Sequence, residues 1–312
     1  MDIGTTYGAI TVGDTENAYT LSGSSTNIHT STGDINIYGT ATSSGATTLE
    51  NSSSGTITVV GAVTSTGETD GSNVSITTNN QAISLSQATA GDASQNVLYT
   101  KKGNVTVSSG KADTTIKGNA DVAGALQVST TTGAINVGEN AAKSAYTLKG
   151  NTVALNSTTG GINLYGLATS ESSTLLQTTT GNISVYGGLK TTKDDTNDVQ
   201  VLTANGDISL NKNTNLTDVT KVIESAGDVT ITETSDTSSG TIGIYGDVAA
   251  STTGNLAVTG KRGNITIGAD GTDKAVTLSG KKTDISSING NIDVHGTITS
   301  STDTTVQTTG TG

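Results

Sequence analysis

Short segments in which apolar and polar residues alternate recur along the chain, and each begins with a glycine. In residues 33–37 the order is glycine, polar, apolar, polar, apolar. The same order returns at 103–107, 181–185, 206–210, 227–231 and 263–267. Strict alternation behind a turn residue is typical of a half-buried β-strand. A regular recurrence of such strands predicts a solenoid, because each unit buries its apolar side only against the next.

The residue that follows the glycine is usually Asp or Asn. Gly-Asp or Gly-Asn begins at residues 33, 103, 181, 206, 227, 254, 263 and 290. Glycine provides positive φ, and an Asx side chain bonds readily to its own turn backbone. We therefore interpret these Asp and Asn residues as structural. With Ile35 and Ile37 inward, the same register places residues 57 and 59, 183 and 185, 242 and 244, and 292 and 294 inward.

The sequence also has a longer repeat, each copy of which contains several of the short segments. Residues 19–23 (YTLSG) return as 146–150 (YTLKG) and as 276–280 (VTLSG). The offset between the second and third copies is 130 residues, as from Ile135 to Ile265. The copies are predicted at 1–127, 128–257 and, in part, 258–312.

We predict an all-β protein, a right-handed parallel β-helix with three short strands per coil. A coil of roughly 25 residues gives about twelve coils in a chain of 312 residues. The chain is expected to be one continuous solenoid excised from a longer protein.

Composition narrows the classes of function. Hydrophobic residues make up 31%, which suits a thin core inside a narrow coil, and the regular alternation argues against disorder. A net charge of -12 argues against nucleic-acid binding. The chain has no cysteine, so it has no disulfide framework or thiolate metal site. Membrane insertion of this segment is not expected, because no long apolar run is present.

Four tyrosines share one outward position just before a glycine. They are Tyr38, Tyr165, Tyr186 and Tyr245. Exposed aromatic rings in a row stack on sugars or on a partner surface. The alternative, which we favour, is that each ring covers a neighbouring strand.

Two acidic loops contain oxygen ligands that suit Ca²⁺. The residues are Asp194, Asp195 and Asp198 in one loop and Asp270 and Asp273 in the other. Neither loop matches a known calcium-loop spacing, so solvated loops are favoured. We predict no metal and no cofactor.

Catalytic signatures are weak. The two histidines, His29 and His295, occupy ladder positions, and Arg262 has only Lys261 beside it. A polysaccharide-cleaving enzyme requires clustered carboxylates in a groove. Ice binding requires threonine on every rung of one face, and Ser, Asn or Lys stands in many matching places. We therefore expect a protein that is not an enzyme, with a polysaccharide-active enzyme or an ice-binding protein as weaker alternatives.

The Gly-x-Ile-x-Val cassettes, the polar turns and the scarcity of aromatic residues resemble bacterial autotransporter passengers and filamentous-haemagglutinin-type surface adhesins. The resemblance covers essentially the whole chain, but its motifs are generic to the architecture. It implies a right-handed β-helix, export to the bacterial cell surface, and a role in adhesion or as a spacer. The amino-terminal secretion domain and the carboxy-terminal barrel of such proteins have no counterpart in this sequence.

The leading expectation is a stalk or spacer segment of a secreted adhesin, located outside the cell. The alternative is a self-assembling filament or surface-layer subunit joined end to end through its coil edges. Expected partners are a host-surface or polysaccharide ligand, or further copies of the chain in end-to-end or lateral contact.

Overall fold

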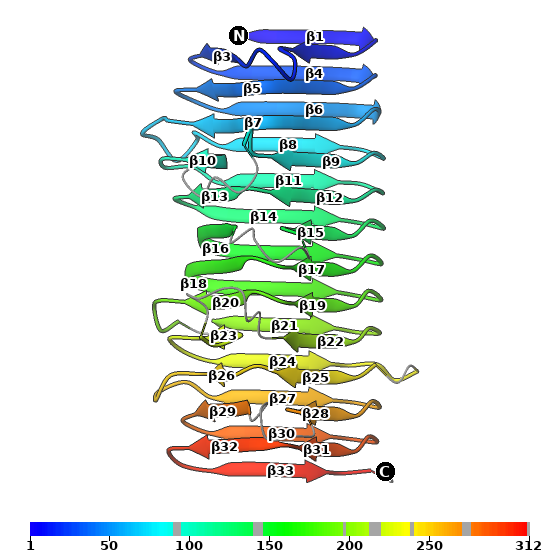
Figure 1. The fold of residues 1–312 in the computed structure, drawn as a ribbon, viewed down its shortest axis with the longest axis vertical. Helices are drawn as coiled ribbons and strands as arrows, with labels where there is room; N and C mark the ends of the chain where they lie inside the picture. Colours follow the sequence, from blue (N-terminus) through cyan, green and yellow to red (C-terminus); the bar gives the residue numbers. More distant parts are fainter. Residues whose placement is uncertain are drawn as a thin grey trace. The chain divides into compact units, whose positions relative to one another are not determined.

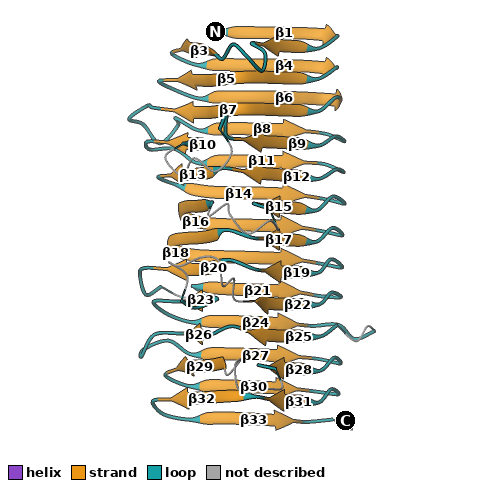
Figure 2. Cartoon of the chain, in the orientation of Figure 1, coloured by secondary structure: helices purple, strands orange, loops and turns teal. Residues whose placement is uncertain are grey.

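The structure is a computed structural model that describes residues 1–89, 95–139, 146–195, 198–211, 220–237, 240–269 and 276–310. The described residues form strands, turns and bends, without a helix (Figure 2). They divide into two compact units, Met1–Leu155 and Asn156–Gly312.

The strands of unit 1 follow one another in chain order. They are β1 (Asp2–Tyr7), β2 (Ile10–Val12), β3 (Tyr19–Gly23), β4 (Thr26–Thr32), β5 (Ile35–Ser43), β6 (Thr47–Ser54), β7 (Ile57–Ser65), β8 (Val74–Thr78), β9 (Ile83–Ser86), β10 (Asn96–Thr100), β11 (Val105–Ser109), β12 (Thr114–Lys117), β13 (Asn119–Val122), β14 (Ala125–Thr130), β15 (Ile135–Val137) and β16 (Thr147–Ser157), which contains the unit boundary.

Unit 2 contains the remaining strands. Its strands are β17 (Ile162–Leu164), β18 (Leu167–Thr178), β19 (Ile183–Val185), β20 (Gly188–Thr191), β21 (Val199–Thr203), β22 (Ile208–Asn211), β23 (Ile223–Glu224), β24 (Val229–Glu233), β25 (Ile242–Tyr245), β26 (Val248–Ala249), β27 (Leu256–Gly260), β28 (Ile265–Ile267), β29 (Val276–Gly280), β30 (Thr283–Ser287), β31 (Ile292–Val294), β32 (Gly296–Ser300) and β33 (Thr304–Thr308).

Within each unit the strands stack in three parallel ladders (Figure 1). In unit 1 the first ladder joins β1, β4, β6, β8, β11 and β14, and the second joins β2, β5, β7, β9, β12 and β15. In unit 2 the first ladder joins β18, β21, β24, β27, β30 and β33, and the second joins β17, β19, β22, β25, β28 and β31. The third ladder of unit 2 joins β18, β20, β23, β26, β29 and β32. The chain is thus a β-solenoid of about 11 turns, which confirms the predicted fold and lies close to the twelve coils expected.

Some coils do not have three separate strands. β5 and β7 each run through a corner, so that one strand belongs to two ladders. Gly39 and Gly61 lie at these corners with φ of 133° and 142°. Side chains rarely tolerate this region, so glycine lets the strand turn without breaking its hydrogen bonds.

Aliphatic side chains from the ladders fill the interior of each unit. Ile35, Ile57 and Ile183 are 0% exposed. Burying such a side chain contributes roughly 1.5–3 kcal/mol. The inward register predicted from the sequence is correct at these positions. The register also holds at the final coil, where β31 pairs Ile292 with Ile265 and Val294 with Ile267. Ile292 is nevertheless only half-buried and Val294 is 36% exposed, because no described strand pairs with the other edge of β31.

The Asx side chains before the strands link one coil to the next. Asp34 Oδ1 accepts the backbone N–H of Thr56 at 2.8 Å, and Asn182 Oδ1 accepts the N–H of Asp207 at 2.8 Å. The sequence predicted bonds within each turn. The bonds instead run between coils, because parallel stacking places the next turn directly against the Asx oxygen.

Candidate functional site

Two of the four candidate tyrosines stack on each other. β17 and β19 pair Leu164 with Val185, so the residues that follow, Tyr165 and Tyr186, lie on adjacent rungs. Their ring centroids are 4.8 Å apart and their planes differ by 8°. Partial burial, followed by the neighbouring Tyr186, raises the pKa of Tyr165. One face of each ring is therefore covered by its partner.

Tyr245 belongs to the same unit but is not part of this stacked pair. Asn211 pairs with Tyr245 and separates it from Tyr186 along the column. The Tyr245 ring lies over Gly243, with Cε2 2.6 Å from the place that a Cβ on Gly243 would occupy. Tyr38 belongs to unit 1, where it pairs with Val60. The structure thus brings two candidates together, and a third covers a glycine of its own strand.

Asp198, from the first acidic loop, is completely buried. Its Oδ1 accepts the N–H of Asp195 at 2.9 Å, and its Oδ2 accepts the N–H of Asp228, one coil on, at 2.9 Å. Burial raises the pKa of Asp198 above its ordinary value, the two backbone bonds act in the opposite direction, and Asp194 and Asp195 add to the rise. Asp198 therefore belongs to the same set of inter-coil acceptors as Asp34.

The neighbouring carboxylates of this loop are not arranged as a metal centre. Asp194 Oδ2 accepts the Thr253 hydroxyl at 2.8 Å. Among the described residues, no group of three or more His, Cys, Asp or Glu side chains is arranged to hold a metal ion. Asp270 and Asp273, the second candidate loop, lie outside the described residues.

Each histidine lies at ion-pair distance from a nearby aspartate. His29 Nε2 lies 3.2 Å from Asp2 Oδ1, and its ring lies against Gly4 of the preceding coil. His295 follows the end of β31, and its Nε2 lies 3.2 Å from Oδ1 of Asp293 in that strand. His29 belongs to unit 1 and His295 to unit 2, and each ring faces an aspartate of its own unit.

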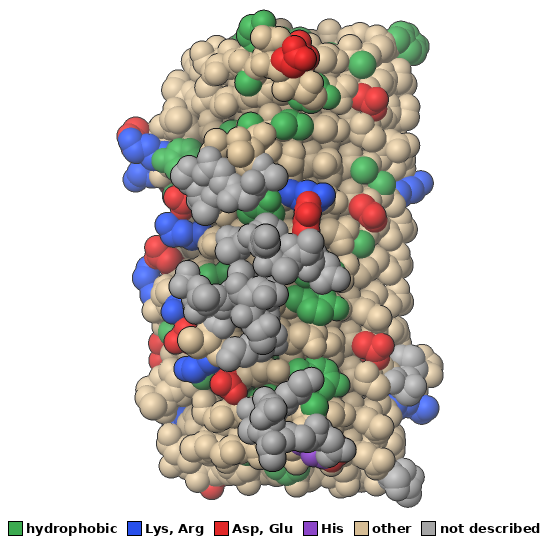
Figure 3. Space-filling model, in the orientation of Figure 1, with side chains coloured by type: hydrophobic (Ala, Val, Ile, Leu, Met, Phe, Trp, Pro, Cys, Tyr) green, Lys and Arg blue, Asp and Glu red, His purple; other side chains and the backbone are tan. Residues whose placement is uncertain are grey.

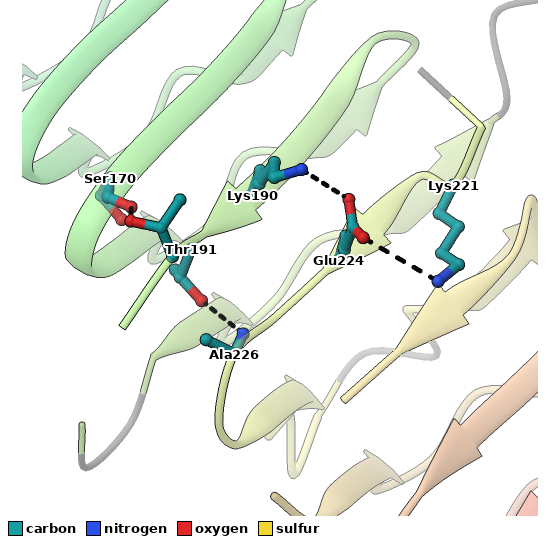
Figure 4. Close-up of polar contacts among 7 residues, drawn as sticks. Ser170, Lys190, Thr191, Lys221, Glu224 and Ala226 are labelled. Atoms are coloured by element: carbon teal, nitrogen blue, oxygen red, sulfur yellow. Dashed lines mark hydrogen bonds and ion pairs between the residues drawn. The ribbon is translucent and has the colours of Figure 1, made fainter. Parts of the chain in front are cut away.

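A charged cluster in unit 2 was not found from the sequence. Glu224 in β23 lies between two lysines, with Lys190 Nζ at 2.9 Å and Lys221 Nζ at 4.0 Å (Figure 4). The hydrogen bond from Lys190 lowers the pKa of Glu224, although partial burial opposes it. Below this cluster, the Thr191 hydroxyl accepts the N–H of Ala226 at 3.0 Å. The sequence signal is weak, because Lys190 and Glu224 are 34 positions apart.

A similar lysine–carboxylate pair joins β13 and β16 in unit 1, where Lys149 Nζ lies 3.0 Å from Asp121 Oδ1. Basic and acidic side chains are interspersed along one edge in Figure 3. Exposed pairs of this kind contribute little to stability, about 0–1 kcal/mol each. They prevent like charges from facing each other on neighbouring rungs.

No family model, curated protein or solved structure matches this chain. Among the described residues, no helix has the length and apolar character needed to cross a membrane.

Proposed function

We propose that this chain is a structural spacer within a large secreted adhesin on the bacterial cell surface. The observation that supports this proposal is the uniform pairing of the strands. Within each unit a strand pairs with the strands one coil before and after it, over the same aliphatic ladders. A spacer needs length and stiffness, and repeated coils provide both without requiring different side chains in different places.

The polar surface suits this role. The net charge is -12 and the exposed strand positions are mostly Thr, Ser, Asn and Gln, which keep a long protein soluble outside the cell. The absence of cysteine suits a chain that is exported unfolded through an oxidising compartment. The proposal assigns no catalytic role to the segment.

The second candidate function is that of a filament subunit joined end to end through the edges of its coils. Unpaired N–H and C=O groups on a strand edge pair readily with a strand of another copy.

Negative-stain electron microscopy of residues 1–312 over a concentration series tests both functions. The spacer predicts discrete, unbranched particles whose length does not change with concentration. Fibres that lengthen as the concentration rises would favour the filament subunit. Particles of irregular form would contradict both.

A further inference from the structure

The outer face of the first ladder in unit 2 carries no charge over four strands. On β18, β21, β24 and β27 the outward side chains are Leu175, Gln177, Gln200, Leu202, Thr230, Thr232, Ala257 and Thr259. All of them are half-buried or exposed. This part of the surface is therefore neutral in a protein with a net charge of -12.

Two leucines on this face depart from the long repeat. Thr48 and Thr77 stand in copy one where Leu175 and Leu202 stand in copy two, and Thr305 follows in copy three. The strands of copy one form with threonine at these places, so folding does not require leucine. On an exposed strand threonine is at least as favourable as leucine. The leucines are therefore not needed for the strands themselves, and they add apolar surface that copy one lacks.

The leucines alternate with two amides. β18 and β21 pair Leu175 with Gln200 and Gln177 with Leu202. Diagonal neighbours in such a pair are about 7–8 Å apart, within reach of side chains of this length. The four residues, which we call the Leu–Gln patch, therefore present two apolar groups and two amides in a crossed arrangement.

We propose that the Leu–Gln patch binds a neutral polysaccharide. A sugar ring has an apolar C–H face and a rim of hydroxyl groups. The leucine side chains of the patch match the C–H face, and the glutamine amides match the hydroxyl groups. Glutamine amides both donate and accept hydrogen bonds, as hydroxyl groups require. The net charge of the protein repels anionic polymers, and the face offers no carboxylate to a cationic one. This inference is independent of the spacer role.

The test is co-sedimentation of the intact chain with microcrystalline cellulose, chitin and an insoluble β-1,3-glucan. The chain is expected to bind at least one of them, and to show no binding to alginate beads. The variant Leu175→Thr/Leu202→Thr, which restores the residues of copy one, is expected to lower the affinity about tenfold. The matched control is Thr48→Ser/Thr77→Ser in unit 1, which is expected to bind as the unchanged chain does.

Binding to none of the three neutral polymers would overturn the proposal, and so would equal binding by the leucine variant. If the leucine variant fails to fold, as judged by circular dichroism, Gln177→Ala/Gln200→Ala replaces it with the same expected loss. Neither result changes the particle shape by which the spacer proposal is tested. Failure of the polysaccharide proposal can therefore be distinguished from failure of the spacer proposal.

Discussion

The Asp207 carboxylate holds Thr241 of the next coil through two hydrogen bonds. Its Oδ1 accepts the backbone N–H at 2.7 Å and the hydroxyl at 2.9 Å. Asp34 holds Thr56 in the same way in unit 1, at 2.8 Å and 3.0 Å. The Asx side chain of these Gly-Asx sequences therefore hydrogen-bonds one coil to the next and fixes the spacing between their turns.

Replacing Asp207 by alanine is expected to lower the free energy of unfolding by about 0.5–1.5 kcal/mol, because the exposed Thr241 N–H and hydroxyl exchange their carboxylate acceptor for water. Asp207→Asn retains an acceptor oxygen and is expected to cost less than about 0.5 kcal/mol. Urea unfolding measures both changes, and amide exchange at Thr241 should accelerate in the alanine variant alone. Asp70→Ala, which removes an exposed turn carboxylate, controls for charge. Equal exchange rates in the two Asp207 variants would contradict this account.

Much of the fold could be predicted because its determinants are local. The alternation that begins at Ile35 fixes which side of the strand is buried, and glycine marks each turn. The continuity of β5 through Gly39 could not be predicted, since a glycine inside such a pattern indicates a turn as readily as a bend. Register across coils was predictable only where the coil length is constant.

The candidate sites were harder to predict because they depend on contacts between coils. The burial of Asp198 follows from its stacking on Asp228, and the sequence of the acidic loop contains no sign of it. The Lys190–Glu224 pair spans 34 positions, a longer separation than the repeat implies. Tyr165 and Tyr186 were correctly placed in one column, but only the structure shows that they stack.

Glu233 and Gly260 face each other at the ends of β24 and β27. The carboxylate is 0% exposed and accepts the N–H of Ser235 at 2.7 Å and that of Lys261 at 3.1 Å. Two short hydroxyl residues, Ser109 and Thr130, occupy the corresponding pair in β11 and β14. A long side chain beside a glycine thus replaces two short ones.

The presence of Glu233 and Gly260 in place of two short side chains predicts that these two positions are energetically coupled. Glu233→Ser removes the carboxylate acceptor of the buried Ser235 N–H and of the half-buried Lys261 N–H. Gly260→Thr brings a Cβ within 3.3 Å of Ile265 Cγ1. Each single change is expected to lower the urea midpoint. The double variant is expected to cost less than the sum by about 0.5–3 kcal/mol. Additive costs would show that the two positions do not compensate, and Thr259→Ser on the outer face serves as the neutral control.

The stacked rings of Tyr165 and Tyr186 predict a second coupling. An aromatic pair contributes about 0.5–1.5 kcal/mol beyond the area it buries. A double-mutant cycle with alanine at both positions should return a coupling energy in this range. The same cycle with Tyr186 and Tyr245 is expected to give no coupling, because Asn211 lies between them. Coupling of equal size in both cycles would contradict the observed stacking.

The Lys190–Glu224 pair predicts a stability difference that depends on pH. The folded state lowers the pKa of Glu224 below its unfolded value, 4.5. Its contribution is therefore present above that value and is lost as the pH falls through the folded pKa. The Glu224 side chain is 45% exposed, so the contribution is at most about 1 kcal/mol. Glu224→Gln should match the unchanged chain at low pH and be less stable at pH 7, whereas a constant difference would exclude the linkage.

The raised pKa of Asp198 predicts that stability changes with pH in the opposite direction. Its pKa is raised in the folded state by burial, so between the unfolded value, 3.8, and the folded value the native protein binds more protons than the unfolded chain. Stability therefore falls as the pH rises through this window, since ionising the buried carboxylate opposes folding. Asp198→Asn cannot ionise and should remove the slope, although its single acceptor oxygen serves only one of the two N–H groups. Urea midpoints between pH 3 and pH 7 provide the measurement, with Asp228→Asn, whose Oδ1 accepts the Asn255 N–H at 2.7 Å, as the control variant. If Asp198→Asn leaves the pH profile of the midpoint unchanged, Asp198 does not carry this effect.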